Sequence, residues 1–109
     1  MRKDFDRAIA DFNVAIKLDP RLAWIFEGRG IARVVRNELD SAIADFNHAL
    51  RLDPRLAVAY VNRGKALLLQ GKETEAAKDF ERALAINPEL RRELTTVIKT
   101  ASEVRTGRP

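Results

Sequence analysis

The side chains best suited to chemistry are few in this chain. His48 is the only histidine, and Asp45 precedes it by about one helical turn. Metal sites need several convergent ligands, and nucleophilic catalysis needs a serine or cysteine held beside a base. Cysteine is absent, and no Ser–His–Asp arrangement can be assembled around His48. We therefore interpret His48 as an exposed surface imidazole and predict no catalytic residue and no metal site.

The segment from Gly28 to Arg33 resembles a phosphate-binding glycine loop only superficially. It contains Gly28 and Gly30 but lacks a third glycine, and it follows no predicted strand. It also lies inside a predicted helix, where each glycine costs about 1 kcal/mol relative to alanine. That cost predicts close packing at one of the two glycines, and we expect no cofactor here.

Three carboxylates, Asp11, Asp45 and Asp79, recur at a constant spacing. They could form a periodic acidic surface, or they could pair with arginines inside each repeat. An arginine at the edge of a core needs a partner, which favours the pairs Arg29–Asp45 and Arg63–Asp79. Nothing in these patterns supports catalysis, and we predict that the protein is not an enzyme.

A 34-residue period organises the whole chain. Two sets of residues keep this spacing: Phe12, Phe46 and Phe80, and Pro20, Pro54 and Pro88. A fixed period of this length is typical of a solenoid built from one repeated supersecondary unit. The apolar spacing within the copies is helical, which predicts six helices and no strand, at about residues 4–18, 21–36, 39–52, 55–70, 73–86 and 89–104. Asn37 and Gly71 are expected to end the second and fourth helices.

Composition sets further bounds on the class of protein. The 109 residues carry a net charge of +4 and no cysteine. We expect one globular domain. No apolar run approaches about 18 residues, which predicts no membrane span, and Met1-Arg2-Lys3-Asp4 leads directly into an amphipathic pattern, which predicts no signal peptide. Cytoplasmic localisation is favoured, and the periplasm is not excluded. Nucleic-acid binding is unlikely, because lysine and arginine alternate with acidic residues along nearly every helix.

The pattern of the 34-residue unit resembles the tetratricopeptide repeat (TPR) family. Its characteristic positions fall on Phe26, Gly30, Ala42, Phe46, Ala49 and Pro54, and again on Tyr60, Gly64, Ala76, Phe80, Ala83 and Pro88. The chain departs from the family pattern at Arg29, Arg33, Arg63, Leu67 and Ile98. The resemblance implies an all-α fold of antiparallel helix–turn–helix repeats with a right-handed superhelix. It divides the chain into the second half of a repeat (1–22), two full repeats (23–56 and 57–90), and a C-terminal capping helix and tail (91–109).

In this family the first helices of successive repeats line a groove that binds a peptide or a helix. The resemblance therefore implies a protein–protein interaction module with a protein or peptide partner. The implied groove residues are Trp24, Glu27, Ile31, Val34, Val58, Val61, Asn62, Lys65 and Leu68. Val35 and Leu69 fit this surface and packing between helices equally well.

Some relatives grip the C-terminal carboxylate of chaperone tails with a clamp of lysine, asparagine and arginine. Asn62 matches the clamp asparagine, and Arg92 could replace one lysine. Glu27, Ile31 and Thr96 occupy other clamp positions, and Glu27 would repel a carboxylate. The resemblance thus implies no useful affinity for acidic chaperone tails.

The N-terminal helix has no first helix of its own repeat before it in this sequence. We expect Phe5, Ala8 and Phe12 to form an open apolar face, while Ile9 and Ile16 face the next helix. Either a preceding segment or a second molecule would cover that face. The alternative function is therefore structural self-association as a homodimer or higher oligomer, through this face or through the groove.

Overall fold

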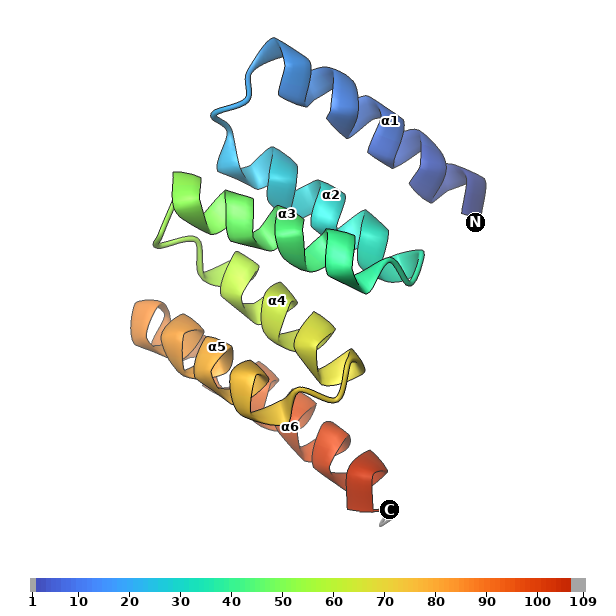
Figure 1. The fold of residues 1–109 in the computed structure, drawn as a ribbon. Coiled ribbons are helices and arrows are strands. Elements are labelled where there is room, and N and C mark those ends of the chain that lie inside the picture. Colours follow the sequence, from blue (N-terminus) through green and yellow to red (C-terminus); the bar gives the residue numbers. More distant parts are fainter. Residues whose placement is uncertain (1, 107–109) are drawn as a thin grey trace.

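The structure, a computed structural model, describes the backbone of residues 2–106 and the side chains of residues 3–99. This part of the chain forms six α-helices, a short 3-10 helix and no strand (Figure 1): α1 (Arg2–Leu18), α2 (Ala23–Val35), α3 (Leu39–Leu52), α4 (Ala57–Leu69), α5 (Glu73–Ile86), η1 (Pro88–Leu90) and α6 (Arg91–Thr106). Successive helices run antiparallel and stack along the long axis of the molecule. The predicted all-α helical repeat is confirmed. No helix among the described residues is long and apolar enough to cross a membrane.

The first helix of each full repeat ends as predicted. Asn37 and Gly71 follow α2 and α4 with φ angles of 61° and 80°, in the left-handed region. At the end of α4, the N–H of Lys72 donates to the carbonyl of Leu67 at 2.9 Å. At the end of α2, the N–H of Glu38 donates to the carbonyl of Arg33 at 2.8 Å. Such bonds satisfy carbonyls that the last helical turn leaves without a partner.

Helices α2 and α4 begin two residues later than the sequence predicted, at residues 23 and 57 rather than 21 and 55. The reason is a side-chain turn at each Asp-Pro step. The Asp19 carboxylate accepts a hydrogen bond from the backbone N–H of Arg21 at 3.1 Å, and Asp53 accepts one from Arg55 at 3.0 Å. An aspartate that binds the backbone two residues ahead stabilises a turn in place of helix.

A phenylalanine packed on a glycine joins the two helices of each full repeat. Phe46 of α3 and Phe80 of α5 are 0% and 1% exposed. A Cβ on Gly30 would lie 2.5 Å from Cε1 of Phe46, and a Cβ on Gly64 would lie 2.6 Å from Cε1 of Phe80. Only glycine permits this approach of a helix backbone to an aromatic ring.

The structure corrects the predicted environment of Phe12. Its ring lies against α2, where a Cβ on Gly28 would be 2.6 Å from Cζ of Phe12. Both glycines of α2 therefore pack closely, Gly28 against α1 and Gly30 against α3, where the sequence predicted one. Ile9 is buried and Ile16 packs beside Phe26, as expected.

Helix α6 covers the last repeat. Its apolar spacing in the sequence predicts one packed face, which consists of Leu90, Leu94, Val97, Ile98, Ala101 and Val104. Leu94 is fully buried and Val97 packs against the same cluster. Ile98 is 45% exposed, so its predicted place on the packed face is wrong. Ala101 and Val104, also predicted on that face, lie outside the described side chains.

Candidate functional site

One stripe of α2 presents large apolar side chains to solvent. Trp24, Ile31 and Val35 are 60%, 41% and 54% exposed. Their spacing of i, i+7 and i+11 places them on one side of a helix. Helix α2 packs against α3, α1 and α4, and this stripe is the part of its apolar surface that stays exposed.

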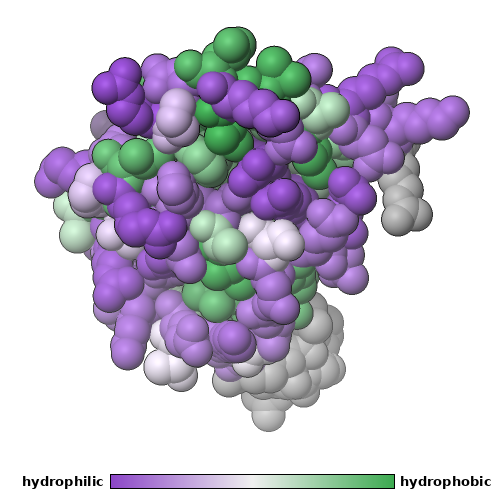
Figure 2. Space-filling view, turned by 45° about the horizontal axis from the view of Figure 1, so that its top comes forward, coloured by the Kyte–Doolittle hydropathy of each residue, from purple (hydrophilic) through white to green (hydrophobic). Residues whose placement is uncertain are grey.

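The same stripe recurs on α4, which contacts α2 directly. Val58 and Leu69 are 45% and 64% exposed, and the side chain of Lys65 is 40% exposed. We call the combined surface the α2–α4 face, which consists of Trp24, Glu27, Ile31, Val35, Val58, Asn62, Lys65 and Leu69. On the side of the molecule drawn in Figure 2, hydrophobic groups likewise gather in patches between hydrophilic side chains.

The α2–α4 face differs from the predicted groove in five residues. Val61 is only 4% exposed and belongs to the buried cluster around Phe80, so it is not available to a partner. Val34 and Leu68 also pack against buried clusters and are half-buried. Val35 and Leu69, for which the sequence left two interpretations open, are exposed on the face.

A hydrogen bond crosses this face between neighbouring repeats. Nδ2 of Asn62 on α4 donates to Oε1 of Glu27 on α2 at 2.6 Å. Burial raises the pKa of Glu27 above its ordinary value, and the hydrogen bond from Asn62 partly offsets that rise. The face therefore contains a half-buried carboxylate held by a neutral amide.

The lysine of the face is already paired. Nζ of Lys65 lies 3.8 Å from Oε1 of Glu93 on α6, and both side chains are substantially exposed. Such an exposed pair adds little to stability, but it places an opposite charge beside the ammonium group. Lys65 therefore contributes little net positive charge to the α2–α4 face.

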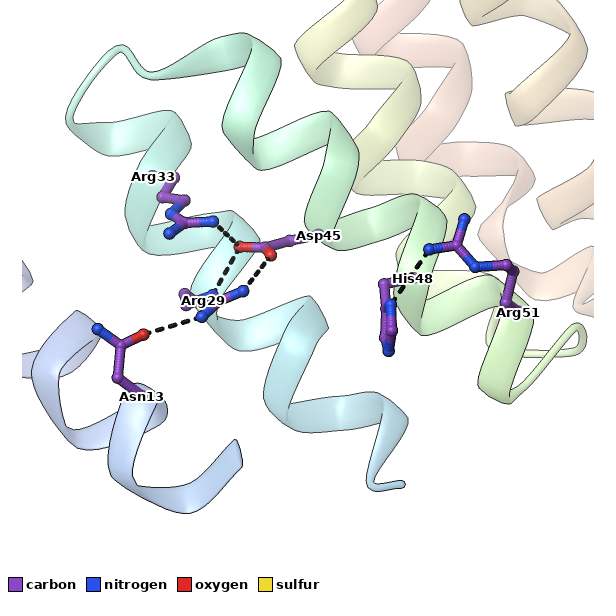
Figure 3. A network of polar contacts seen from close by, with 6 residues as sticks. All are labelled: Asn13, Arg29, Arg33, Asp45, His48 and Arg51. Carbon is purple, nitrogen blue, oxygen red and sulfur yellow. Dashed lines mark hydrogen bonds and ion pairs between the residues drawn. The ribbon is translucent and has the colours of Figure 1, made fainter. Parts of the chain in front are cut away.

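The other side of α2 has a polar network that connects three helices (Figure 3). Nε and Nη2 of Arg29 donate to the two carboxylate oxygens of Asp45 on α3 at 3.0 and 2.7 Å. Nη1 of Arg29 donates to Oδ1 of Asn13 on α1 at 2.8 Å. Arg33 binds the same Asp45 carboxylate at 2.9 Å. The predicted Arg29–Asp45 pair is confirmed, and the contributions of Asn13 and Arg33 were not predicted.

The network recurs one repeat later and confirms the second predicted pair. Arg63 donates to both oxygens of Asp79 at 2.8 and 2.7 Å and to Oδ1 of Asn47 at 2.8 Å. The bond to Asp79 raises the pKa of Arg63 and burial opposes that rise, so the guanidinium stays charged. Arg82 approaches Asp79 at 3.4 Å. Arg63 and Asp79 both line a pocket between α3, α4 and α5. The Asp79 carboxylate in this pocket is therefore already bound by Arg63.

His48 lies in a different environment from the one predicted. It is half-buried, and its ring stacks on Phe26 with centroids 4.0 Å apart. Nη2 of Arg51 lies 3.1 Å from Nδ1 of His48, which accepts because arginine only donates (Figure 3). Within the described residues no group of three or more metal-ligating side chains converges.

The remaining predicted site residues lie on α1 and α6, apart from Asn62 on α4. The residues of the predicted self-association face, Phe5, Ala8 and Phe12 on α1, are half-buried. Of the clamp positions, Asn62 is bound by Glu27, and Arg92 and Thr96 are exposed on α6. The hydroxyl of Thr96 donates to the carbonyl of Arg92 at 3.2 Å.

Comparison with known families and structures places this geometry in context. The tetratricopeptide repeat model matches residues 57–90, and a TPR repeat model matches residues 32–71. The chain belongs to the tetratricopeptide repeat family, whose fold is a protein-interaction module. Comparison with curated proteins found no significant match.

Solved TPR domains share most of this arrangement of helices. The first TPR of Spaghetti (RPAP3), bound to the HSP90 peptide SRMEEVD, is 28% identical, with a TM-score of 0.86 over 95% of this chain and 82% of that chain. The second TPR of Spaghetti, bound to the same peptide, is 30% identical, with a TM-score of 0.74 over 76% of this chain and 77% of that chain. The TPR2B domain of yeast Sti1, in a pHsp70 complex, is 24% identical, with a TM-score of 0.86 over 93% and 85% of the two chains. The last likeness concerns the fold alone.

Proposed function

We propose that this protein is a peptide-binding interaction module and that the α2–α4 face binds its partner. The observation that carries the proposal is the pair of matching exposed stripes on two adjacent helices. Five large apolar side chains are at least 41% exposed there: Trp24, Ile31, Val35, Val58 and Leu69. Exposed apolar groups gathered on one face are typical of a protein-interaction site.

The similar structures support a peptide as the occupant. Both TPR domains of Spaghetti are bound to an HSP90 peptide, and each is at least 28% identical to this chain. The polar network on the other side of α2 is internally paired, since Asp45 binds both Arg29 and Arg33. The α2–α4 face, in contrast, presents exposed apolar side chains on two adjacent helices.

The proposal can be tested by selecting binders from a displayed random-peptide library and then changing the face. Val58→Lys should abolish binding of the selected peptides, because it puts an ammonium group in the middle of an apolar contact. Val14→Lys is the matched control, because Val14 is a 58% exposed valine on α1, outside the face. Trp24 is the only tryptophan, so its fluorescence reports binding at this site. Peptides that bind both variants equally would contradict the proposal.

The alternative function, self-association, has narrower support. Phe5 and Phe12 are incompletely buried, but α2 already covers the Phe12 ring at Gly28. Light scattering at tens of micromolar distinguishes the two functions. A dimer that Phe5→Glu converts to a monomer would favour self-association, whereas a monomer would favour peptide binding.

A further inference from the structure

The position of Glu27 within the apolar stripe is unusual for a carboxylate. Trp24 precedes it by three residues and Ile31 follows it by four, so both flank it on the surface of α2. The residue at the same place in the next repeat is Val61, which is 4% exposed. Glu27 thus puts a charge where the other repeat has a buried apolar side chain, and a partly desolvated charge favours an opposite charge beside it.

Within the part of the chain whose side chains the structure describes, Glu27 receives no such charge. Its partner is the neutral amide of Asn62, which binds Oε1 at 2.6 Å. Among the described side chains no lysine or arginine forms an ion pair with Glu27, and Lys65 is paired with Glu93 at 3.8 Å. An ionised carboxylate has about four acceptor positions, so Glu27 retains the capacity to accept further hydrogen bonds from a bound cation.

The surroundings of Glu27 suit a long cationic side chain. Lysine and arginine have apolar stems that pack along apolar surface while the charged group stays near polar atoms. Ile31 and Val58 are 41% and 45% exposed and offer such a surface. Trp24, 60% exposed, provides an aromatic ring that attracts a cation over its face.

We infer that the α2–α4 face binds an apolar peptide segment that contains a lysine or arginine, with its cationic group against Glu27. The inference rests on the proposed function and names the chemistry of the partner. Charge complementarity argues for it: among the described side chains no cation pairs with the carboxylate of Glu27, and Lys65 is offset by Glu93. An acidic peptide would meet repulsion from Glu27, and the Asn62 amide is already donating.

The test uses the sequences of the peptides that the wild-type protein selects. We expect apolar peptides with a lysine or arginine at a constant position. Replacing that residue by glutamine should weaken binding about tenfold, measured by Trp24 fluorescence. Glu27→Gln should weaken binding of the original peptide by a similar factor and should make the peptide substitution nearly neutral. Glu81→Gln is the matched control, because Glu81 is exposed on α5, away from the face.

Two outcomes separate this inference from the proposed function. Peptides that need Val58 but contain no basic residue, or that bind Glu27→Gln as tightly as the wild type, would overturn the inference and leave the binding face intact. Selected peptides that bind the Val58→Lys variant unchanged would overturn the binding face itself and the inference with it.

Discussion

Asn62 donates a 2.6 Å hydrogen bond to Glu27, and this bond joins the first helices of two successive repeats. The two residues are 35 positions apart and belong to α4 and α2. Asn62 is also the residue that matches the clamp asparagine of the chaperone-binding relatives. The bond therefore holds a half-buried carboxylate on the α2–α4 face.

We predict that the wild-type protein does not bind the peptide SRMEEVD in the micromolar range. Glu27 repels the acidic peptide and already accepts a hydrogen bond from the Asn62 amide, and Ile31 offers no hydrogen bond to a carboxylate. The variant Glu27→Lys with Ile31→Asn should gain measurable affinity, because it removes the repulsion and frees the Asn62 amide. Isothermal titration calorimetry measures both proteins. Micromolar binding by the wild type would show that the prediction is wrong.

The stability of the protein should depend on pH through Glu27. Burial raises the folded-state pKa of Glu27 above its ordinary value of 4.5, partly offset by Asn62. The stabilisation linked to its proton is present below pH 4.5 and is lost as the pH rises through the raised pKa. Glutamine cannot ionise, so Glu27→Gln should become more stable relative to the wild type between pH 4 and pH 7.

Thermal unfolding of the two proteins at both pH values measures this effect. The other carboxylates titrate in both proteins, so their contribution cancels in the difference. A difference in Tm that stays constant, or that moves in favour of the wild type at pH 7, would contradict a raised pKa for Glu27.

The buried Arg63–Asp79 pair should be more sensitive to loss of its arginine than the Arg29–Asp45 pair. Arg63→Leu should cost about 1–3 kcal/mol, because it leaves a buried carboxylate with a weakened set of partners. The remaining partner of Asp79 is Arg82, 3.4 Å away and 56% exposed. In Arg29→Leu, Asp45 keeps Arg33 at 2.9 Å, so we expect a smaller loss.

Urea unfolding of both single variants and of the double variant Arg63→Leu with Asp79→Leu measures these costs. The double variant should recover much of the loss, since it also removes the buried carboxylate that has lost its main partner. Equal stability of the single and double variants at this pair would contradict the interpretation.

Two glycines that contact phenylalanine should differ in their tolerance of alanine. Gly64→Ala should cost about 1–3 kcal/mol, because its Cβ would meet Phe80, which is 1% exposed and enclosed by packing. Gly28→Ala should cost less, because Phe12 is half-buried on the outer helix and can move, while alanine gains about 1 kcal/mol in helix propensity. Thermal unfolding of both variants measures which substitution lowers stability more. Equal losses of stability would contradict the prediction.

The sequence by itself determined the parts of the structure that depend on local spacing. The 34-residue period and the helical apolar pattern predicted six helices, and Asn37 and Gly71 predicted two helix ends. The Arg29–Asp45 and Arg63–Asp79 pairs were also predictable, since each joins two helices of one hairpin whose geometry is set by the repeat. These features follow from interactions between residues that are close in sequence or related by the repeat.

Only the tertiary structure decided which residues of the predicted groove face solvent. Val61 is buried while Val35 and Leu69 are exposed, although all three fitted the apolar pattern. The Glu27–Asn62 bond likewise depends on how α4 sits against α2. The rotation and distance between neighbouring helices set these outcomes, and they result from packing summed over many side chains rather than from any local pattern.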